Sequence, residues 1–173
     1  MKYFRHIVLL AVAGVGWGPM VVAATPASSR WIAPQEAALR ASMAATAAIV
    51  VRTDRGLQVK FPVSSAFPAD AVELRPEGKA LLDVLATVLR KYLRSQIVVA
   101  IYTDAIGRSE YNLQQSQSRA LAVTTYLQAQ GVAASRLIAR GAGESAPLTA
   151  DKTPEERELN RRVEITISAL FSP

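Results

Sequence analysis

The chain has 173 residues, of which 50% are hydrophobic, and its 20 Lys and Arg against 14 Asp and Glu give a formal net charge of +6. It has no Cys and one His, His6, so the chain beyond that residue excludes Ser-His-Asp and Cys-His catalysis, disulfides and the usual His or Cys metal sites. The net positive charge is small and the sequence has no run of Lys and Arg, so nucleic acid is disfavoured as a partner.

Residues 1–24 have the pattern of a secretory signal. Lys2 and Arg5 form a basic start, an apolar run follows, and residues 22–24 (Val-Ala-Ala) offer a small-residue cleavage site. The alternative is a retained inner-membrane anchor, since residues 7–24 approach the roughly 20 apolar residues of a spanning helix, but three Gly and a Pro weaken that helix. Cleavage leaves 18 basic and 14 acidic residues, a charge of +4, on a chain of about 150 residues, which suits one domain in the periplasm or cell envelope.

A linker and a short helix are predicted over residues 25–46. Residues 25–34 are rich in Pro, Ser and Ala, which is typical of an exposed linker. Residues 35–45 are rich in Ala and place two large apolar residues at helical spacing. One domain is expected to occupy residues 47–173.

This domain is predicted to open with a hairpin and an amphipathic helix. Two β-patterned runs, residues 48–52 and 57–63, flank a turn that contains Asp54 and Gly56. Pro76 then suits the first turn of a helix. The apolar residues that follow it recur on one helical face: Leu81, Leu85, Val88, Leu89 and Tyr92.

A buried strand and a second helix follow. Residues 96–102 form a continuous apolar run, short and β-branched, that ends at Thr103-Asp104. Ser109 can cap a helix that runs to about Gln130, where Gly131 suits the helix end.

Two further strands are predicted over residues 136–140 and 162–169, the second from alternation of apolar and polar residues. With short connections, this order of strands and helices predicts a two-layer α+β domain. In it, helices pack on one face of a mixed four-stranded sheet, and the hairpin is an N-terminal extension.

Asp104 is the first candidate for ligand binding, because it follows the carboxyl end of the most apolar strand. Asn112, Ser116 and Arg119 are spaced by four and three residues, so they form one polar stripe on the next helix. The stripe borders the predicted apolar face of Leu113, Ala120, Val123 and Leu127. Asp104 and Arg119 would present an anion beside a cation in one shallow pocket, which complements an amino-acid head group. The alternative is an ordinary surface ion pair with a capping Asn.

Two arginines near the last strand are further candidates. Successive strand residues point to opposite faces, so we expect at most one of Arg161 and Arg162 to join the pocket and the other to be solvated. Tyr102 is interpreted as a sheet aromatic rather than a stacking platform.

Several motifs match a known family in residue type and spacing. They are Thr103-Asp104 with Gly107, Asn112, Ser116 and Arg119-Ala120, residues 141–144 (Gly-Ala-Gly-Glu) with Pro147, and residues 160–165 (Asn-Arg-Arg-Val-Glu-Ile). Over about residues 35–170 the chain resembles the OmpA C-terminal-like domain found in OmpA, Pal and MotB, and looks closest to the YiaD-like members. The departures are Ile101-Tyr102 for the family's Gly-His, Gln115 for its Leu, and the missing lipidated Cys.

The resemblance implies non-covalent binding of peptidoglycan through the meso-diaminopimelate of its stem peptide. Asp104 would accept from the ligand's ammonium and Arg119 would hold its carboxylate. Asn112 and Arg161 would be secondary contacts, and Thr103 would shape the loop. The implied role is to anchor an envelope protein or complex to the cell wall in the periplasm, at the outer membrane, with no catalysis and no cofactor.

Two other functions stay open. The first is a structural component of an envelope assembly, such as a secretion or motor complex, whose other proteins would be partners. The second is a cell-wall hydrolase with two carboxylates, Asp104 with Glu110 or Glu144.

Overall fold

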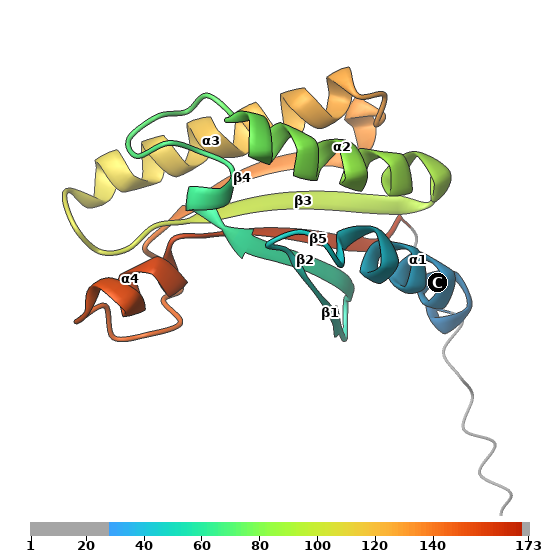
Figure 1. Cartoon of the computed structure of the whole chain (residues 1–173), viewed down its shortest axis with the longest axis horizontal. Coiled ribbons are helices and arrows are strands. Elements are labelled where there is room, and N and C mark those ends of the chain that lie inside the picture. The colour runs from blue at the N-terminus through green and yellow to red at the C-terminus, as the bar shows by residue number, and fades with distance from the viewer. Residues whose placement is uncertain (1–27, 171–173) are drawn as a thin grey trace, which may run out of the picture.

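A computed structural model describes residues 28–170 (Figure 1). The predicted signal, residues 1–24, lies outside the described residues, as does the start of the predicted linker. The elements, in chain order, are α1 (Ser28–Met43), β1 (Ile49–Thr53), β2 (Gly56–Pro62), η1 (Val63–Ser65), α2 (Pro76–Lys91), β3 (Ser95–Tyr102), α3 (Ser109–Ala129), η2 (Ala134–Arg136), β4 (Leu137–Gly143), α4 (Pro154–Asn160) and β5 (Arg162–Ala169). No helix within residues 28–170 is long and apolar enough to cross a membrane.

The strands form one mixed sheet in the order β1-β2-β5-β3-β4, in which only β3 and β4 are parallel. β5 is central: its Ile165 pairs with Val59 of β2 and Val99 of β3, and all three are fully buried. The predicted α+β class is confirmed. The sheet has five strands rather than four, because β2 pairs with β5 along its length and so brings the hairpin into the sheet.

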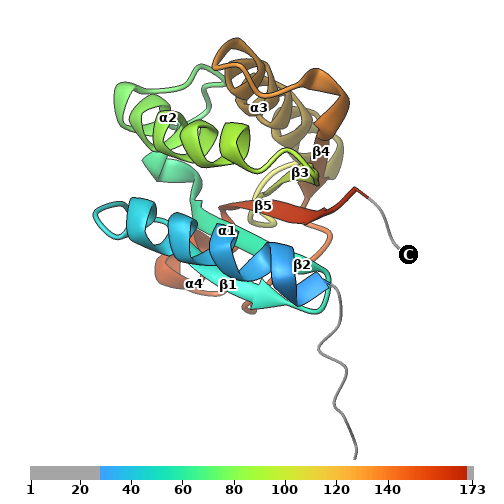
Figure 2. The same ribbon diagram turned by 90° about the vertical axis from the view of Figure 1, so that its right-hand side faces the viewer.

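Helices α1, α2 and α3 cover one face of this sheet, as predicted (Figure 2). Leu39 of α1, Leu85 of α2 and Leu127 of α3 are fully buried in a single core with the inward residues of the strands. Burial of such side chains stabilises the fold by about 2 kcal/mol each. β4 runs so close to α3 that a Cβ on Gly141 would lie 2.5 Å from the backbone nitrogen of Gln117, so glycine is needed there.

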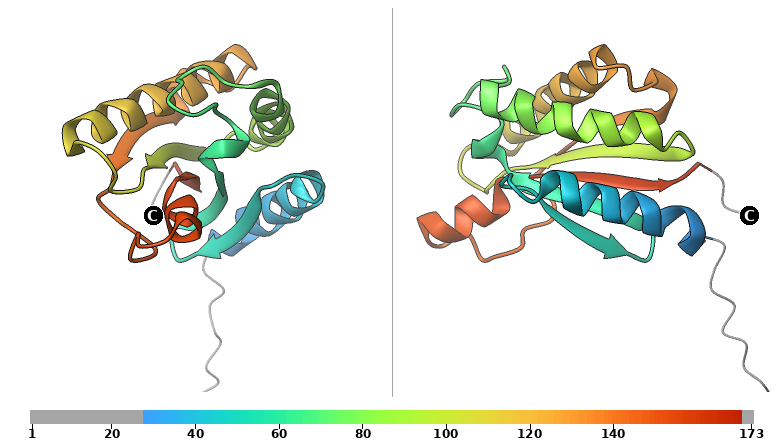
Figure 3. Two further views of the ribbon diagram at one scale, coloured as in Figure 1. Left: turned by 60° about the vertical axis from the view of Figure 1, so that its left-hand side comes forward. Right: turned by 45° about the vertical axis from the view of Figure 1, so that its right-hand side comes forward.

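Two helical segments differ from the sequence prediction. α1 begins at Ser28, inside the predicted linker, because Ile32 packs into the core although Pro34 lies within the helix. α4 lies in a segment for which no element was predicted, apart from the other helices at one end of the sheet (Figure 3). Its sequence signature is a capping box, in which Thr153 and Glu156 each bond the other's backbone N–H.

The orientation of α3 also differs from the prediction. Leu113 is 52% exposed, so its assignment to the apolar face is wrong, while Ala120, Val123 and Leu127 are buried as expected. Near its start, α3 turns Asn112, Ser116 and Arg119 inward instead. Ser109 is not the N-cap, which is Arg108; the Ser109 hydroxyl donates to Glu144 at 2.7 Å. The first turns of α3 therefore bury polar groups, which points to a local role other than core packing.

Candidate functional site

The residues proposed for ligand binding all line one cavity. It has a volume of about 520 Å³ and lies where β3 ends, between the β2–α2 loop, the start of α3 and α4. Thr103, Asp104, Asn112, Arg119 and Arg161 contribute to it. The other lining residues are Val63, Ser64, Phe67, Pro68, Ala69, Asp70, Arg75, Tyr102, Ile106, Gly107, Tyr111, Gln115 and Glu158. The sequence pattern thus identified one shared location for side chains from three separate segments.

Asp104 is held in place by two protein partners. Its Oδ2 accepts from Nη1 of Arg161 at 2.5 Å, and its Oδ1 accepts from the backbone N–H of Ile106 at 3.3 Å. The Asp104 side chain is 12% exposed and that of Arg161 is 38% exposed, so the pair borders the cavity without being sealed from water. The ion pair of Asp104 is therefore with Arg161, and an ordinary surface pair between Asp104 and Arg119 is not formed.

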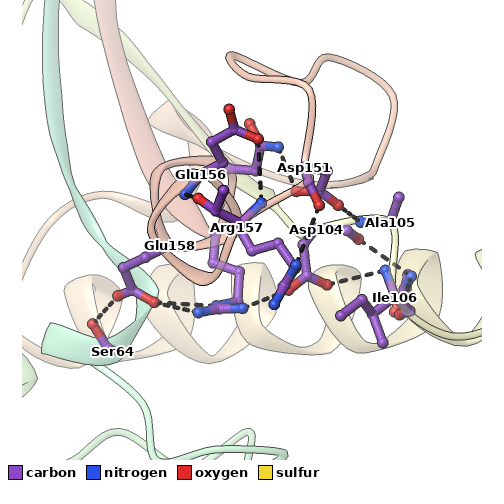
Figure 4. A network of polar contacts seen from close by, with 12 residues as sticks. Ser64, Asp104, Ala105, Ile106, Asp151, Glu156, Arg157 and Glu158 are labelled. Carbon is purple, nitrogen blue, oxygen red and sulfur yellow. Dashed lines mark hydrogen bonds and ion pairs between the residues drawn. The ribbon is translucent and has the colours of Figure 1, made fainter.

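Arg161 also binds Glu158. Glu158 in turn contacts Ser64, which extends the polar contacts to the β2–α2 side of the cavity (Figure 4). Oε2 of Glu158 accepts from Nε and Nη2 of Arg161 at 3.2 and 2.6 Å, and its Oε1 accepts from the hydroxyl of Ser64 at 2.5 Å. Burial of the Arg161 guanidinium lowers its pKa, but the bonds to Glu158 and Asp104 outweigh burial and leave the pKa raised. Burial likewise raises the pKa of Glu158, yet Ser64 and Arg161 leave it lowered. Both groups therefore stay ionised at neutral pH.

Arg119 approaches the cavity from α3 and is 5% exposed. Its Nε donates to the carbonyl oxygen of Ala71 at 2.7 Å and its Nη2 to that of Pro68 at 3.4 Å. The guanidinium also lies over the ring of Phe67, 5.4 Å from the ring centre. Burial lowers the pKa of Arg119, and the nearby Asp70 carboxylate partly opposes this. The β2–α2 loop thus fixes the guanidinium at the edge of the cavity.

Asn112 and Thr103 shape the loop that carries Asp104. Nδ2 of Asn112 donates to the carbonyl oxygen of Ile106 at 3.1 Å and also lies within 3.4 Å of the carbonyl oxygen of Asp104. The backbone N–H of Thr103 donates to Gly143 at 2.9 Å, while its buried Oγ1 has no hydrogen-bond partner among the described residues. Both residues therefore contact the site, and Asn112 acts through the loop backbone in the free protein.

Two residues to which the sequence analysis gave no role in the site support the same loop. Oδ2 of Asp151 accepts from the backbone N–H of Ala105 at 2.6 Å, and its Oδ1 accepts from Nδ2 of Asn160 at 2.6 Å (Figure 4). Burial raises the pKa of Asp151, but these two donors outweigh it and the pKa is lowered. The sequence signal for this support is the capping box of α4, which predicts a helix in this segment. The helix ends at Asn160, directly before Arg161.

Only one of the two successive arginines joins the cavity, as expected, but the other is not solvated. Arg162 is 7% exposed, stacks on the ring of Tyr102 at 3.8 Å, and donates from Nε to Glu164 at 2.8 Å. Lys60 of β2 also pairs with Glu164, at 3.3 Å. Arg162 is therefore surrounded by Tyr102, on whose ring it stacks, and by the ion pairs of Glu164, rather than by solvent.

The ionisable residues of the cavity balance in charge. Three acidic and three basic side chains line the same space: Asp70, Asp104 and Glu158, and Arg75, Arg119 and Arg161.

The two glutamates considered as partners of Asp104 for hydrolysis are not among the lining residues of this cavity. The Glu110 side chain is 83% exposed, and the Glu144 carboxylate accepts from Ser109 and Asn112. Within residues 28–170, no group of three or more acidic or imidazole side chains could hold a metal ion. A cavity with both signs of charge is suited to a zwitterion rather than to a simple anion or cation.

A family model described as the OmpA family matches residues 66–161, a range that begins at the β2–α2 loop and ends at Arg161. The probable lipoprotein YiaD of Escherichia coli is 38% identical over 136 residues, which are 79% of this chain and 62% of that protein. The chain therefore spans less than two thirds of this relative's length.

Two solved structures are similar in fold over most of the chain or a large part of it. The cell wall anchor of the T6SS from Pseudomonas aeruginosa aligns with a TM-score of 0.69 and 30% identity, over 79% of this chain and 98% of that one. The peptidoglycan-associated lipoprotein from Burkholderia pseudomallei aligns with a TM-score of 0.56 and 29% identity, over 60% of this chain and 88% of that one. The fold and the family resemblance seen in the sequence are thereby confirmed.

Proposed function

Because the chain belongs to the OmpA family, we propose that it binds peptidoglycan non-covalently and anchors an envelope protein or complex to the cell wall. The names of two similar structures, a cell wall anchor and a peptidoglycan-associated lipoprotein, support this role. The observation that carries it is one cavity, balanced in charge, that both Asp104 and Arg119 line. The protein would act in the periplasm or elsewhere in the cell envelope.

The proposed ligand is the diaminopimelate of the stem peptide, whose free ammonium and carboxylate match the Asp104 carboxylate and the Arg119 guanidinium that line the cavity. A carboxylate offers about four lone-pair sites, so Asp104 can accept from a ligand ammonium while it keeps Arg161 and the Ile106 N–H. Arg119 has five N–H donors and directs two nitrogens to loop carbonyls, which leaves donors for a ligand carboxylate. The ligand would therefore add to the existing contacts rather than replace them.

The supporting residues have separate tasks in this proposal. Arg161 would lie beside the ligand and hold the Asp104 carboxylate in position through their ion pair. Asn112 and Thr103 would hold the loop in its binding conformation, together with Asp151. The rim includes Ile106 and Tyr111, 62% and 53% exposed, which can contact the apolar stem of the ligand.

The chain would serve as the wall-binding part of a larger envelope assembly. The similarity to the cell wall anchor of the T6SS is the observation that favours a protein partner in addition to peptidoglycan. Co-purification from envelopes with and without wall digestion would separate the two kinds of contact. Partners that stay bound after digestion do not depend on the wall.

The test of wall binding is retention of the exported protein on purified sacculi. We expect the parent to sediment with sacculi and free meso-diaminopimelate to release it. Asp104→Ala should lose retention, and Arg108→Ala, a change at a side chain that is 85% exposed, should not. Equal retention of Asp104→Ala and parent, with both folded, would show that this cavity is not the binding site.

A further inference from the structure

A second hollow lies at the opposite end of the domain from Asp104. It has a volume of about 340 Å³ and forms where α1 meets the carboxyl end of α2. Its lining residues are Pro34, Gln35, Lys91, Tyr92, Leu93 and Arg94. β3 begins directly after these residues and runs along the sheet (Figure 1). Asp104 follows its other end, so the linings of the two cavities lie at opposite ends of that strand.

The rim of this hollow is cationic and apolar. Lys91 and Arg94 are both exposed, and neither forms an ion pair with a carboxylate within residues 28–170. Leu93 lies between them in the chain and is 65% exposed. The nearest acidic residue on α1, Glu36, directs its carboxylate to Arg40 and Arg52 instead. The two rim cations are therefore available to an anion, beside an apolar side chain.

The inner side of the hollow contains a buried polar group. Gln35 is 0% exposed, and neither Nε2 nor Oε1 of its carboxamide forms a hydrogen bond with any residue of the described range 28–170. The neighbouring Tyr92 hydroxyl donates to the carbonyl oxygen of Pro34 at 3.0 Å and so does not satisfy Gln35. A buried carboxamide without partners costs about 1–3 kcal/mol. It can both donate and accept, so a hydroxyl is a matching ligand group.

We propose that this hollow binds the headgroup of an anionic phospholipid, phosphatidylglycerol being the matching chemistry. The phosphate pairs with Lys91 and Arg94, a headgroup hydroxyl bonds the Gln35 carboxamide, and Leu93 enters the apolar layer of the membrane surface. α1 begins at this same end of the domain (Figure 1). A membrane on this side leaves the Asp104 cavity facing away from it, toward the wall.

Vesicle flotation with the exported protein tests the charge contribution. The parent should float with phosphatidylcholine vesicles that contain phosphatidylglycerol and not with phosphatidylcholine alone. Lys91→Gln/Arg94→Gln should lower the partition coefficient about 30-fold, from about 1 kcal/mol for each cation near an anionic lipid surface. Lys79→Gln/Arg140→Gln removes the same charge at exposed positions elsewhere and should change it little. Equal losses for the two pairs would overturn a defined site.

Gln35→Leu tests the buried carboxamide separately. Because this change removes a polar group without partners, it should raise the melting temperature while it weakens binding to phosphatidylglycerol. If Gln35 had only a structural role, the change would not raise the melting temperature and weaken lipid binding at the same time. Unchanged lipid binding by Gln35→Leu would overturn the proposed role of the hollow. Binding of inorganic phosphate by the parent, with no flotation on either vesicle, would overturn the assignment to lipid.

Discussion

Replacement of Arg119 by Lys tests the geometry of the wall-binding cavity at its most buried charge. Arg119 makes one short and one long hydrogen bond to the β2–α2 loop and stacks on Phe67. A charged hydrogen bond contributes about 1.5–3 kcal/mol, and a lysine, with one nitrogen on a different stem, can keep at most one of the two bonds. With part of the stacking also lost, we expect Arg119→Lys to be destabilised by about 2 kcal/mol.

The assay is thermal unfolding followed by circular dichroism, alongside retention on sacculi. For a domain of this size, about 2 kcal/mol lowers the melting temperature by about 4–8 °C. Arg140→Lys is the matched control, because Arg140 is exposed on β4, and its effect should stay within about 0.5 kcal/mol. Arg119→Lys should also bind sacculi more weakly, since a single ammonium cannot contact a carboxylate with two parallel bonds. A variant as stable as the parent would refute the role given to the loop carbonyls.

Three further changes give distinct results. Asp104→Asn should weaken binding of meso-diaminopimelate about 10- to 100-fold by calorimetry, the loss of a charge-assisted hydrogen bond, and unchanged affinity would contradict the contact. Glu158→Gln should cost at most about 1 kcal/mol, because the Glu158 and Arg161 side chains are 40% and 38% exposed. Since the folded-state pKa of Glu158 is lowered, this contribution is present above its unfolded pKa of about 4.3 and lost as pH falls through the folded value; a pH-independent difference would be inconsistent with it. Thr153→Ala should cost about 1 kcal/mol through the lost cap of α4, whereas Thr153→Ser should be near neutral in denaturant unfolding.

The parts of the fold that follow from periodicity could be predicted from the sequence. α2 was predicted from Pro76 and the apolar face that follows it, and β3 from an unbroken β-branched run, because both elements bury regular apolar patterns. The hairpin was predicted, but its pairing with β5 was not. Strand partners far apart in sequence leave no local signal, so the extra strand of the sheet needed the structure.

The sequence predicted that the candidate residues share one location, but the contacts that they make there could not be predicted from it. Spacing placed Asp104 and Arg119 near one another, and both line the cavity. The pairing of Asp104 with Arg161, and of Arg119 with loop carbonyls, depends on tertiary positions of α4 and the β2–α2 loop. The same holds for Arg162. Alternation along the strand predicted that at most one of Arg161 and Arg162 lines the pocket, but the burial of Arg162 depends on its contacts with Tyr102 and Glu164.

The central claim is that the cavity recognises a doubly charged amino acid through Asp104 and Arg119. The direct measurement is the Nε–H signal of Arg119 in nuclear magnetic resonance spectra during titration with meso-diaminopimelate. We predict a saturable shift of this signal together with the backbone N–H of Ile106, and a much weaker response to 1,5-diaminopentane, which has two ammonium groups and no carboxylate. Saturable binding of meso-diaminopimelate that leaves both signals unmoved, or no binding at all, would contradict the claim.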